Sequence, residues 1–371
     1  MREPLPPLSQ IPADIVAVND YLPYAQARMS EQAWAYFTGG AADERLLAQN
    51  EQAPHFYQIW PRVLRDFSGA HTQLTLFGQD YAFPIFLAPV AYQRLAHPAG
   101  EQATALAAAA MQTPFVVSMQ SSVDLTTLAA QAAGPRWLQW YWQTDKAASQ
   151  RLLDLAVQVG IEAIVLTVDA PVSGIRNREQ RAQFRLPAGV DAVLLRDVNR
   201  PAEPVAQAGQ SPLFGSGFLS KAPTWPQIQQ FIHDCPLPVI IKGILHPEDA
   251  EKAIAYGAAG IVVSNHGARV LDVAPTPFQV LSVIAKTVNK RIPILLDGGI
   301  RRGSDVFIAL ALGASAVLIG RPYIYGLAAA GPAGVAHVLH MLRTEFEVTM
   351  ALAGCARLDQ IQPDCLWSSS R

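Results

Sequence analysis

Short apolar runs alternate with longer segments of helical period along most of this sequence, and the alternation strongly constrains its fold. Repeated βα units produce this pattern, because a parallel strand buried on both faces is apolar throughout and needs a helix to cross back. Eight such runs, rich in Val, Ile and Leu, lie at residues 84–90, 115–118, 137–141, 163–168, 238–243, 260–265, 292–297 and 315–320. Eight units fit a closed barrel better than an open sheet with fewer strands. We therefore predict a (β/α)8 TIM barrel over about residues 84–330, in a single domain that spans residues 1–371.

Helical segments are expected on both sides of the barrel. Residues 13–53 predict two or three helices, with Asn19 and Ser30 as N-caps. Residues 332–354 predict a long amphipathic C-terminal helix that Gly354 ends.

One connection is much longer than the others. It spans about residues 171–223, after the fourth predicted strand, and is rich in Pro and Gly. A βα connection usually has about 2–6 residues. Because active sites of this fold lie at the C-terminal ends of the strands, we predict a lid over the catalytic face. The alternatives are a decorative insertion or an oligomer contact.

Composition excludes several classes of protein. Half of the 371 residues are hydrophobic, 16% are charged and the formal net charge is −2, which indicates a core-rich globular protein without a basic surface for nucleic acid. Cys235, Cys355 and Cys365 lack CxxC spacing, so neither a disulfide framework nor a metal site is expected. The N-terminal residues do not have the pattern of a signal peptide, and no apolar stretch reaches the roughly 18 residues of a membrane span. These features favour a cytoplasmic protein.

Polar residues gather where the predicted strands end, which is where barrel enzymes build their active sites. Strand interiors are apolar, so this placement favours function over chance. The residues are Ser118, Gln139, Tyr141, Thr167, Asp169, Lys242, Ser264, His266, Asp297 and Arg321.

His266 is the candidate catalytic base. A lone histidine is more often structural, but Asp169 ends another strand and could orient the ring and stabilise its protonated form. Lys242 would need a charge partner at the end of the fifth strand. It could form a plain salt bridge, form a Schiff base, or stabilise a developing anion on a cofactor ring.

Two Gly- and Arg-rich turns predict a phosphate site. Residues 297–305 contain Gly298, Gly299 and Arg301 before a helix, and Arg321 follows the eighth strand. Glycines allow close backbone approach, and we expect free N–H groups at the helix N-terminus. The alternative is that the glycines serve turn conformation only. A mononucleotide is favoured over a dinucleotide because no GxGxxG stands between a strand and a helix.

With these motifs, the sequence resembles the FMN-dependent 2-hydroxy-acid oxidase family, which includes glycolate oxidase, lactate oxidase and mandelate dehydrogenase. SNHGAR together with DGGIRRG is a specific combination of that family, whereas either fragment alone occurs in other barrels. The likeness covers nearly the whole chain and lies in residues 36–44, 87–91, 97–101, 166–179, 240–243, 263–272, 296–314 and 319–322.

The resemblance implies roles for the matching residues. His266 would take a proton from the substrate with Asp169 as its partner, and Tyr141 would hydrogen-bond near the reacting hydroxyl. Three residues would hold the substrate carboxylate: Tyr36, Arg176 and Arg269.

The resemblance also implies an FMN site. Lys242 would lie by the flavin N1 and O2 edge and stabilise the reduced ring. Asp297 would hold the ribityl chain, and Arg301, Gly320 and Arg321 the phosphate. The other residues implied to contact FMN are Pro89, Val90, Ala91, Ser118, Gln139, Thr167, Ser264, Gly298 and Gly299.

The expected reaction is oxidation of an (S)-2-hydroxy acid to the 2-oxo acid, with O2 reoxidising the flavin and giving H2O2. A dehydrogenase using a quinone or protein acceptor, another FMN enzyme, and a flavin-binding regulator are the alternatives, and hydride and carbanion routes both stay open. Residues 116–124 lack an aromatic residue that narrows the pocket in several members, and Val90 replaces a threonine of glycolate oxidase. We expect a lactate-like or bulkier, mandelate-like substrate. The family also implies a homotetramer.

Overall fold

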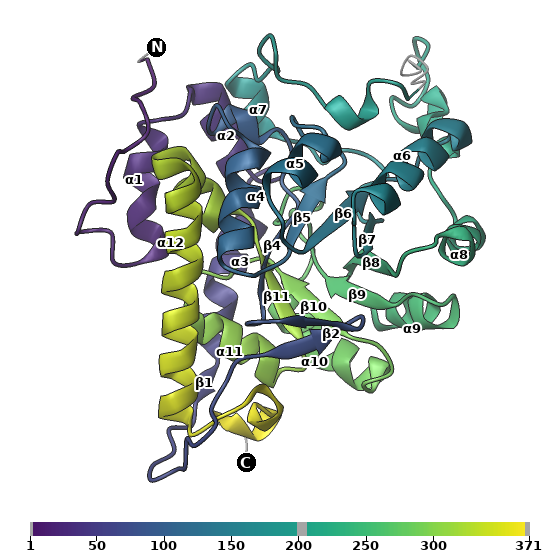
Figure 1. Cartoon of the computed structure of the whole chain (residues 1–371). Helices are drawn as coiled ribbons and strands as arrows, with labels where there is room; N and C mark the ends of the chain where they lie inside the picture. Colours follow the sequence, from purple (N-terminus) through teal and green to yellow (C-terminus); the bar gives the residue numbers. More distant parts are fainter. Residues whose placement is uncertain (1–2, 199–205, 368–371) are drawn as a thin grey trace.

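A closed barrel of eight parallel strands forms the centre of the molecule (Figure 1). The structure is a computed structural model, and it describes residues 3–198 and 206–367. Each predicted apolar run overlaps one strand, so the predicted (β/α)8 TIM barrel is confirmed. In barrel order the strands are β10 (Ile294–Asp297), β11 (Ala316–Ile319), β4 (Ile85–Leu87), β5 (Phe115–Ser118), β6 (Arg136–Trp140), β7 (Ile164–Thr167), β8 (Val239–Ile244) and β9 (Gly260–Val263).

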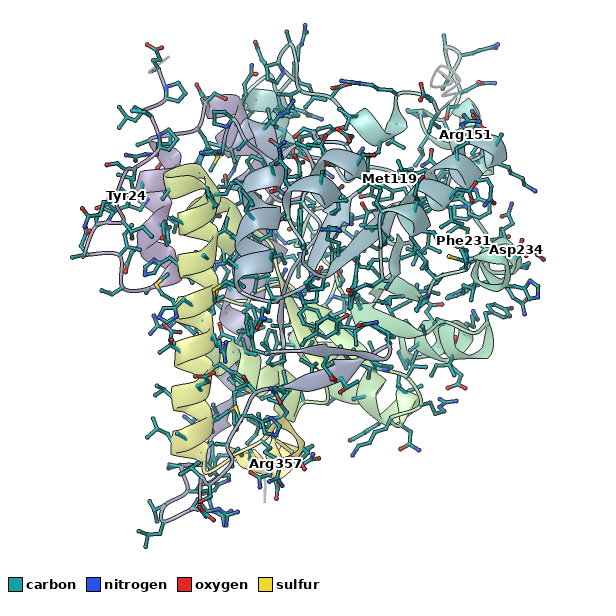
Figure 2. The ribbon with its side chains drawn as sticks, viewed as in Figure 1. Tyr24, Met119, Arg151, Phe231, Asp234 and Arg357 are labelled. Carbon is teal, nitrogen blue, oxygen red and sulfur yellow. The ribbon has the colours of Figure 1, made fainter. Side chains whose placement is uncertain are left out.

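Helices surround the barrel and cover the outer faces of its strands (Figure 1). Several begin at an N-cap side chain of the expected type: Asp124, Asp145 and Thr276 each accept a hydrogen bond from the backbone of the first turn. Arg151 and Asp234 mark the outer side of this layer in Figure 2. The helices between the strands are α4 (Glu101–Ala110), α5 (Leu125–Gln131), α6 (Lys146–Gln158), α8 (Trp225–Asp234), α9 (Pro247–Ala255), α10 (Pro277–Val288) and α11 (Gly303–Ala311).

The barrel interior is a packed apolar layer. Each of the eight strands contributes one fully buried side chain to it, so the lower half of the barrel contains no channel. The residues are Phe86, Val116, Trp137, Val165, Ile240, Val262, Leu295 and Leu318.

A short hairpin closes the N-terminal end of the barrel. It consists of β2 (Leu74–Leu76) and β3 (Gln79–Tyr81), which pair antiparallel. Leu76 and Tyr81 belong to the same apolar cluster as the barrel interior, and the Phe77 ring meets the Trp137 ring edge-on at 5.6 Å. Water is thereby kept out of this end, and the opposite end alone is left for a site.

The segment before the barrel, where two or three helices were expected, forms α1 (Tyr21–Gln26), α2 (Glu31–Thr38) and α3 (Arg45–Gln52). Ser30 caps α2 as predicted, because its side chain accepts from the Ala33 N–H. The prediction for Asn19 was wrong. It lies inside a short 3-10 helix, Val18–Asp20, and Asp20 uses its side chain to accept from the N–H groups of Val16 and Ala17.

The C-terminal helix α12 (Arg321–Ala353) runs along one side of the barrel beside α1 (Figure 1). It is kinked at Ala330 and Gly331, so the predicted helix over 332–354 is its second part. Gly354 ends it in the left-handed conformation, as predicted, with φ of 76°. The short strand β12 (Leu366–Trp367) follows and pairs with β1 (Gln58–Ile59).

The predicted lid emerges from the C-terminal end of β7, and its described residues include one α-helix, α7 (Asn177–Arg181). Three 3-10 helices follow, Val193–Leu195, Phe214–Ser216 and Phe218–Lys221. Residues 199–205 lie outside the described part of the chain. The first half of the segment reaches the barrel mouth, where the Val193 N–H donates to the Ser121 carbonyl.

Within the described residues, no helix is both long and apolar enough to cross a membrane. No group of three or more His, Cys, Asp or Glu side chains in that part of the chain is arranged to hold a metal ion.

Candidate active site

A cavity opens at the C-terminal end of the barrel, and nearly all the predicted site residues line it. The predicted residues in its wall are Tyr36, Pro89, Val90, Ala91, Ser118, Gln139, Tyr141, Thr167, Arg176, Lys242, His266, Arg269, Asp297, Gly298, Gly299, Arg301, Gly320 and Arg321. Asp169 and Ser264 do not line it, and each bonds to a residue that does.

His266 stands between an acid and a phenol. Its Nδ1 lies 2.8 Å from Asp169 Oδ1, and its Nε2 lies 3.4 Å from Tyr141 Oη. A carboxylate at Nδ1 accepts the proton of that nitrogen, which leaves Nε2 able to accept a proton on the cavity side. The pairing of Asp169 with His266 that we expected from the strand ends is present.

Asp169 is held in its charged form. Burial raises the pKa of its carboxyl, but the neighbouring His266 and Lys242 lower that pKa by more than burial raises it. The pKa therefore lies below its ordinary value. Gly243 makes room for this carboxylate, since a β-carbon there would overlap the Asp169 side chain. The backbone at Gly243 also needs a φ of 110°, which favours glycine.

The turn that carries His266 is held by a pair of amides that sequence analysis missed. His266, Gly267 and Ala268 all have positive φ, an unusual run for residues with side chains. Asn265 accepts from the Ala268 N–H, and its amide exchanges two hydrogen bonds with Asn50 at 3.0 and 2.8 Å. Both asparagines are buried. Only the position of Asn265 beside His266 could have pointed to it in the sequence.

Lys242 forms a buried ion pair. Its Nζ lies 3.0 Å from Asp297 Oδ2 and 2.8 Å from Ser264 Oγ. Burial lowers the pKa of Lys242, but Asp297 and Asp169 raise it more, so the net pKa is raised. A Schiff base needs a neutral amine, so this ammonium fits the salt-bridge and anion-stabilising interpretations instead.

Arg269 and Arg176 put two positive charges at the rim of the cavity. Arg269 Nη1 donates to the carbonyls of Tyr36 and Gly39, and its guanidinium lies 5.0 Å from the centre of the Tyr36 ring. Burial and the nearby Arg176 lower the pKa of Arg269, and burial raises the pKa of the Tyr36 hydroxyl. The side chains expected to hold a carboxylate therefore lie together.

Glu179 also lies at this rim, although the sequence analysis gave it no role. Its Oε1 accepts from Arg269 Nη2 at 2.9 Å and from Arg176 Nη1 at 3.3 Å. Its place in α7, three residues after Arg176, was the only signal in the sequence.

The predicted phosphate turns differ from expectation in one respect. The N–H groups of Arg301 and Arg302 donate to Asp305, and that of Gly303 donates to Glu345. For these three residues the expectation of free N–H groups at the start of α11 was therefore wrong, because acidic side chains already accept from them.

The two arginines of these turns have different surroundings. Arg301 Nη2 pairs with Glu51 at 2.6 Å. Arg321 donates to the carbonyls of Phe37, Gly39 and Gly267, and burial lowers its pKa to about 10. Both line the cavity with Gly299 and Gly320, so cationic side chains and glycine backbone meet at its deep end.

The donors and acceptors of the cavity fit FMN. Ser118, Gln139 and Thr167 form a hydrogen-bonded chain across three neighbouring strand ends, which presents amide and hydroxyl groups to a polar ring edge. Asp297 Oδ1 is buried and has no hydrogen-bond partner within the described residues, so it could accept a hydrogen bond from a ribityl hydroxyl. Lys242 and Arg301 would supply cations for the flavin ring and for the phosphate.

Comparison with known proteins also indicates an FMN-dependent enzyme. The family described as FMN-dependent dehydrogenase matches residues 25–368. The chain belongs to this family.

Relatives and solved structures agree with that membership. The enzyme is 45% identical to an L-lactate oxidase of Roseobacter sp. (strain GAI101), over 95% of this chain and 94% of the relative. It is 38% identical to a glycolate oxidase of Spinacia oleracea, over 94% of each chain. A mandelate oxidase variant solved with (S)-mandelic acid has a TM-score of 0.85 at 38% identity and covers 95% of this chain and 98% of that one. The protein is thus an enzyme of the FMN-dependent (S)-2-hydroxy-acid oxidase family, and the alternative of a non-enzymatic flavin-binding regulator is set aside.

Proposed function

We propose that this enzyme oxidises lactate-like and bulkier (S)-2-hydroxy acids, including aromatic ones such as mandelate, to 2-oxo acids and passes the electrons to O2, giving H2O2. One observation carries the proposal: His266, which is paired with Asp169, lines the same cavity as Arg176, Arg269 and Lys242. A base, a carboxylate clamp and a cation for a flavin are the three groups that this oxidation needs.

The proposed roles follow from the contacts. Arg269 and Arg176 bind the substrate carboxylate, for which a guanidinium offers paired donors. His266 Nε2 takes a proton from the substrate, and Asp169 stabilises the charged ring that results. Burial raises the pKa of the Tyr141 hydroxyl, so this group stays protonated and donates a hydrogen bond near the substrate hydroxyl. FMN, when bound, accepts the two electrons, and Lys242 and Asp297 hold it at the strand ends.

The pocket wall supports a bulky substrate. Val90 and Gln120 line the cavity, and no aromatic residue lies between residues 116 and 124 to narrow it. Met119, labelled in Figure 2, is fully buried, and its sulfur lies 3.4 Å from the Tyr141 backbone nitrogen. Relatives named L-lactate oxidase and a mandelate oxidase solved with (S)-mandelic acid are consistent with such substrates.

A two-stage assay tests the proposal. Purified yellow enzyme is mixed anaerobically with glycolate, L-lactate or (S)-mandelate, and bleaching of the flavin is followed; air is then admitted and peroxide is measured. We expect bleaching by lactate and mandelate faster than by glycolate, followed by peroxide. Faster turnover of glycolate would show the substrate class to be wrong. Bleaching reversed by a quinone but not by air would favour the dehydrogenase alternative.

Gln120 offers a sharper test of pocket size. Gln120→Trp should slow flavin reduction by mandelate much more than reduction by glycolate, because the indole fills the space for an aromatic substituent. Gln120→Leu has nearly the original volume and is the matched control, expected to keep the substrate ranking of the wild type. Equal slowing of both acids by the Trp variant would argue against the proposed position of the substituent.

Several features of the protein stay predictions. A single domain over residues 1–371, a homotetramer, a cytoplasmic location and the lid function of residues 171–223 rest on the sequence. Light scattering of the purified holoenzyme tests the tetramer.

A further inference from the structure

The two arginines proposed to bind the substrate carboxylate already share a carboxylate from the chain itself. Glu179 Oε1 accepts from both Arg269 and Arg176, and the side chains of all three residues are at most 21% exposed. An anion that binds the same cations competes with any other anion for them. Two positive charges and one negative charge leave the site with a net charge of only about +1.

Arg269 has few other donors to offer. Its Nη1 is used twice by the carbonyls of Tyr36 and Gly39, so the edge formed by Nε and Nη2 is left for a ligand. Glu179 takes a hydrogen bond from Nη2 on that edge. Bidentate binding of a substrate carboxylate therefore requires Glu179 to share or release this nitrogen.

Arg176 has a donor to spare. Its Nε is buried and has no hydrogen-bond partner within the described residues. A buried guanidinium N–H without an acceptor is costly, and a ligand oxygen would satisfy it. This second observation also points to an anion that arrives between the two arginines.

Glu179 is hydrogen-bonded to a neighbouring residue of the predicted lid, Phe184. The Phe184 N–H donates to the Glu179 carbonyl at 2.9 Å across a turn in which Gln183 has φ of 52°. The Phe184 ring stacks on the ring of Tyr36 at 4.8 Å with an interplanar angle of 15°. One short segment thus touches the carboxylate clamp at Glu179 and covers the clamp tyrosine with Phe184.

The outer side of this segment faces a second cavity, which shares Arg176 and Glu179 with the active-site rim and contains Phe184 and Arg185 in its wall. Arg176 lines both this cavity and the active-site cavity, where Arg269 also lies.

We propose that Glu179 is a resident carboxylate that holds the clamp when no substrate is present, and that an incoming carboxylate binds by displacing it. This inference rests on the proposed function for the identity of the clamp. Glu179 acts through Arg176 and Arg269 and sets how weakly monocarboxylates bind.

Glu179→Gln in the holoenzyme tests the proposal. The amide has the same shape but carries no charge, so we expect acetate, pyruvate and benzoylformate to bind about tenfold more tightly, as measured by titration of the flavin absorbance. KM for the hydroxy acid should fall by a similar factor, and kcat should change little. Glu179→Asp, with a shorter side chain that cannot reach both arginines, should tighten binding less.

Asp191→Asn is the matched control. Asp191 lies in the same segment and pairs with Arg196 at 2.7 Å, away from the clamp, so its loss should leave the affinities unchanged. Unchanged or weaker binding by both Glu179 variants would overturn the proposal and show that Glu179 only supports Arg269. If no hydroxy acid bleaches the wild-type flavin, the proposed function fails, whereas acetate still tests the competition.

Discussion

The two halves of the barrel interior are built by the same eight strands, but the side chains of the lower half are apolar and most of those at the upper end are polar. In the lower half, every strand presents one buried apolar side chain. Two residues later, at the upper end, the inward positions are Ala88, Ser118, Gln139, Thr167, Lys242, Ser264, Asp297 and Gly320. Alternate residues of a strand share a face, so each strand supplies both a floor and a reactive rim.

This difference shows that one half of the barrel serves stability and the other carries the functional groups. The lower half is filled to the density of a core. The rim contains two buried carboxylate oxygens, Asp169 Oδ2 and Asp297 Oδ1, without hydrogen-bond partners in the described part of the chain. Unsatisfied buried acceptors destabilise a protein unless a ligand or water uses them. The apolar floor therefore supplies the stability that such a rim costs.

The largest effect should follow from His266→Ala, which removes the base from the rim. We expect flavin reduction by the hydroxy acid to slow about 1000- to 10,000-fold, because the variant has no side chain at this position that can take the substrate proton. Anaerobic stopped-flow bleaching measures the rate, and the visible spectrum reports bound FMN. The exposed His340→Ala is the control. Loss of FMN in the His266 variant would indicate a structural histidine instead.

Lys242→Met removes the cation of the buried pair with Asp297. The holoenzyme should lose about 3–5 kcal/mol of unfolding free energy, because a buried carboxylate is left without its partner. Urea denaturation measures this loss, and flavin reduction should slow as well. Lys252→Met, whose pair with Asp249 is half exposed at 3.9 Å, should change the unfolding free energy by less than about 1 kcal/mol. Similar losses in the two variants would contradict a special role for the rim lysine.

Ile240→Val tests the floor of the same strand, two residues before Lys242. Loss of one buried methylene should reduce the unfolding free energy by about 0.5–1.5 kcal/mol. Flavin reduction should keep its wild-type rate and KM, because Ile240 does not line the cavity. A changed rate would mean that the two halves are coupled more tightly than the packing indicates.

Asp169→Asn should reveal the pH dependence of the rim. Since the pKa of Asp169 in the folded protein is lowered from its ordinary value of 3.8, its charge stabilises the native state above that pH. The wild type should therefore exceed the variant in unfolding free energy at pH 7, and the gap should shrink as the pH falls below about 4. Denaturation of both proteins between pH 7 and 3 measures the gap. A constant gap would mean that the carboxylate charge contributes nothing.

The sequence predicted the rim better than its surroundings. Ser118, Lys242 and His266 could be placed because each lies at the end of a recognisable apolar run or directly after it. Asn19 was misplaced as an N-cap because its neighbour Asp20 turns back on the preceding backbone. Three N–H groups expected to be free at the start of α11 were already taken: Asp305 accepts from two of them, and Glu345, from a distant helix that no local pattern connects to this turn, accepts from Gly303.

By itself the sequence determined the barrel, the residues at its mouth and the reaction class, because strand alternation and strand ends are local properties. Tertiary structure alone decided which groups touch. Asp169 meets His266 across 97 residues, Asn50 meets Asn265 across 215, and Glu179 reaches Arg269 across 90. Closure of the barrel brings these distant segments together at one rim. The contacts between their side chains then set the local charge and decide which carboxylate Arg269 can bind.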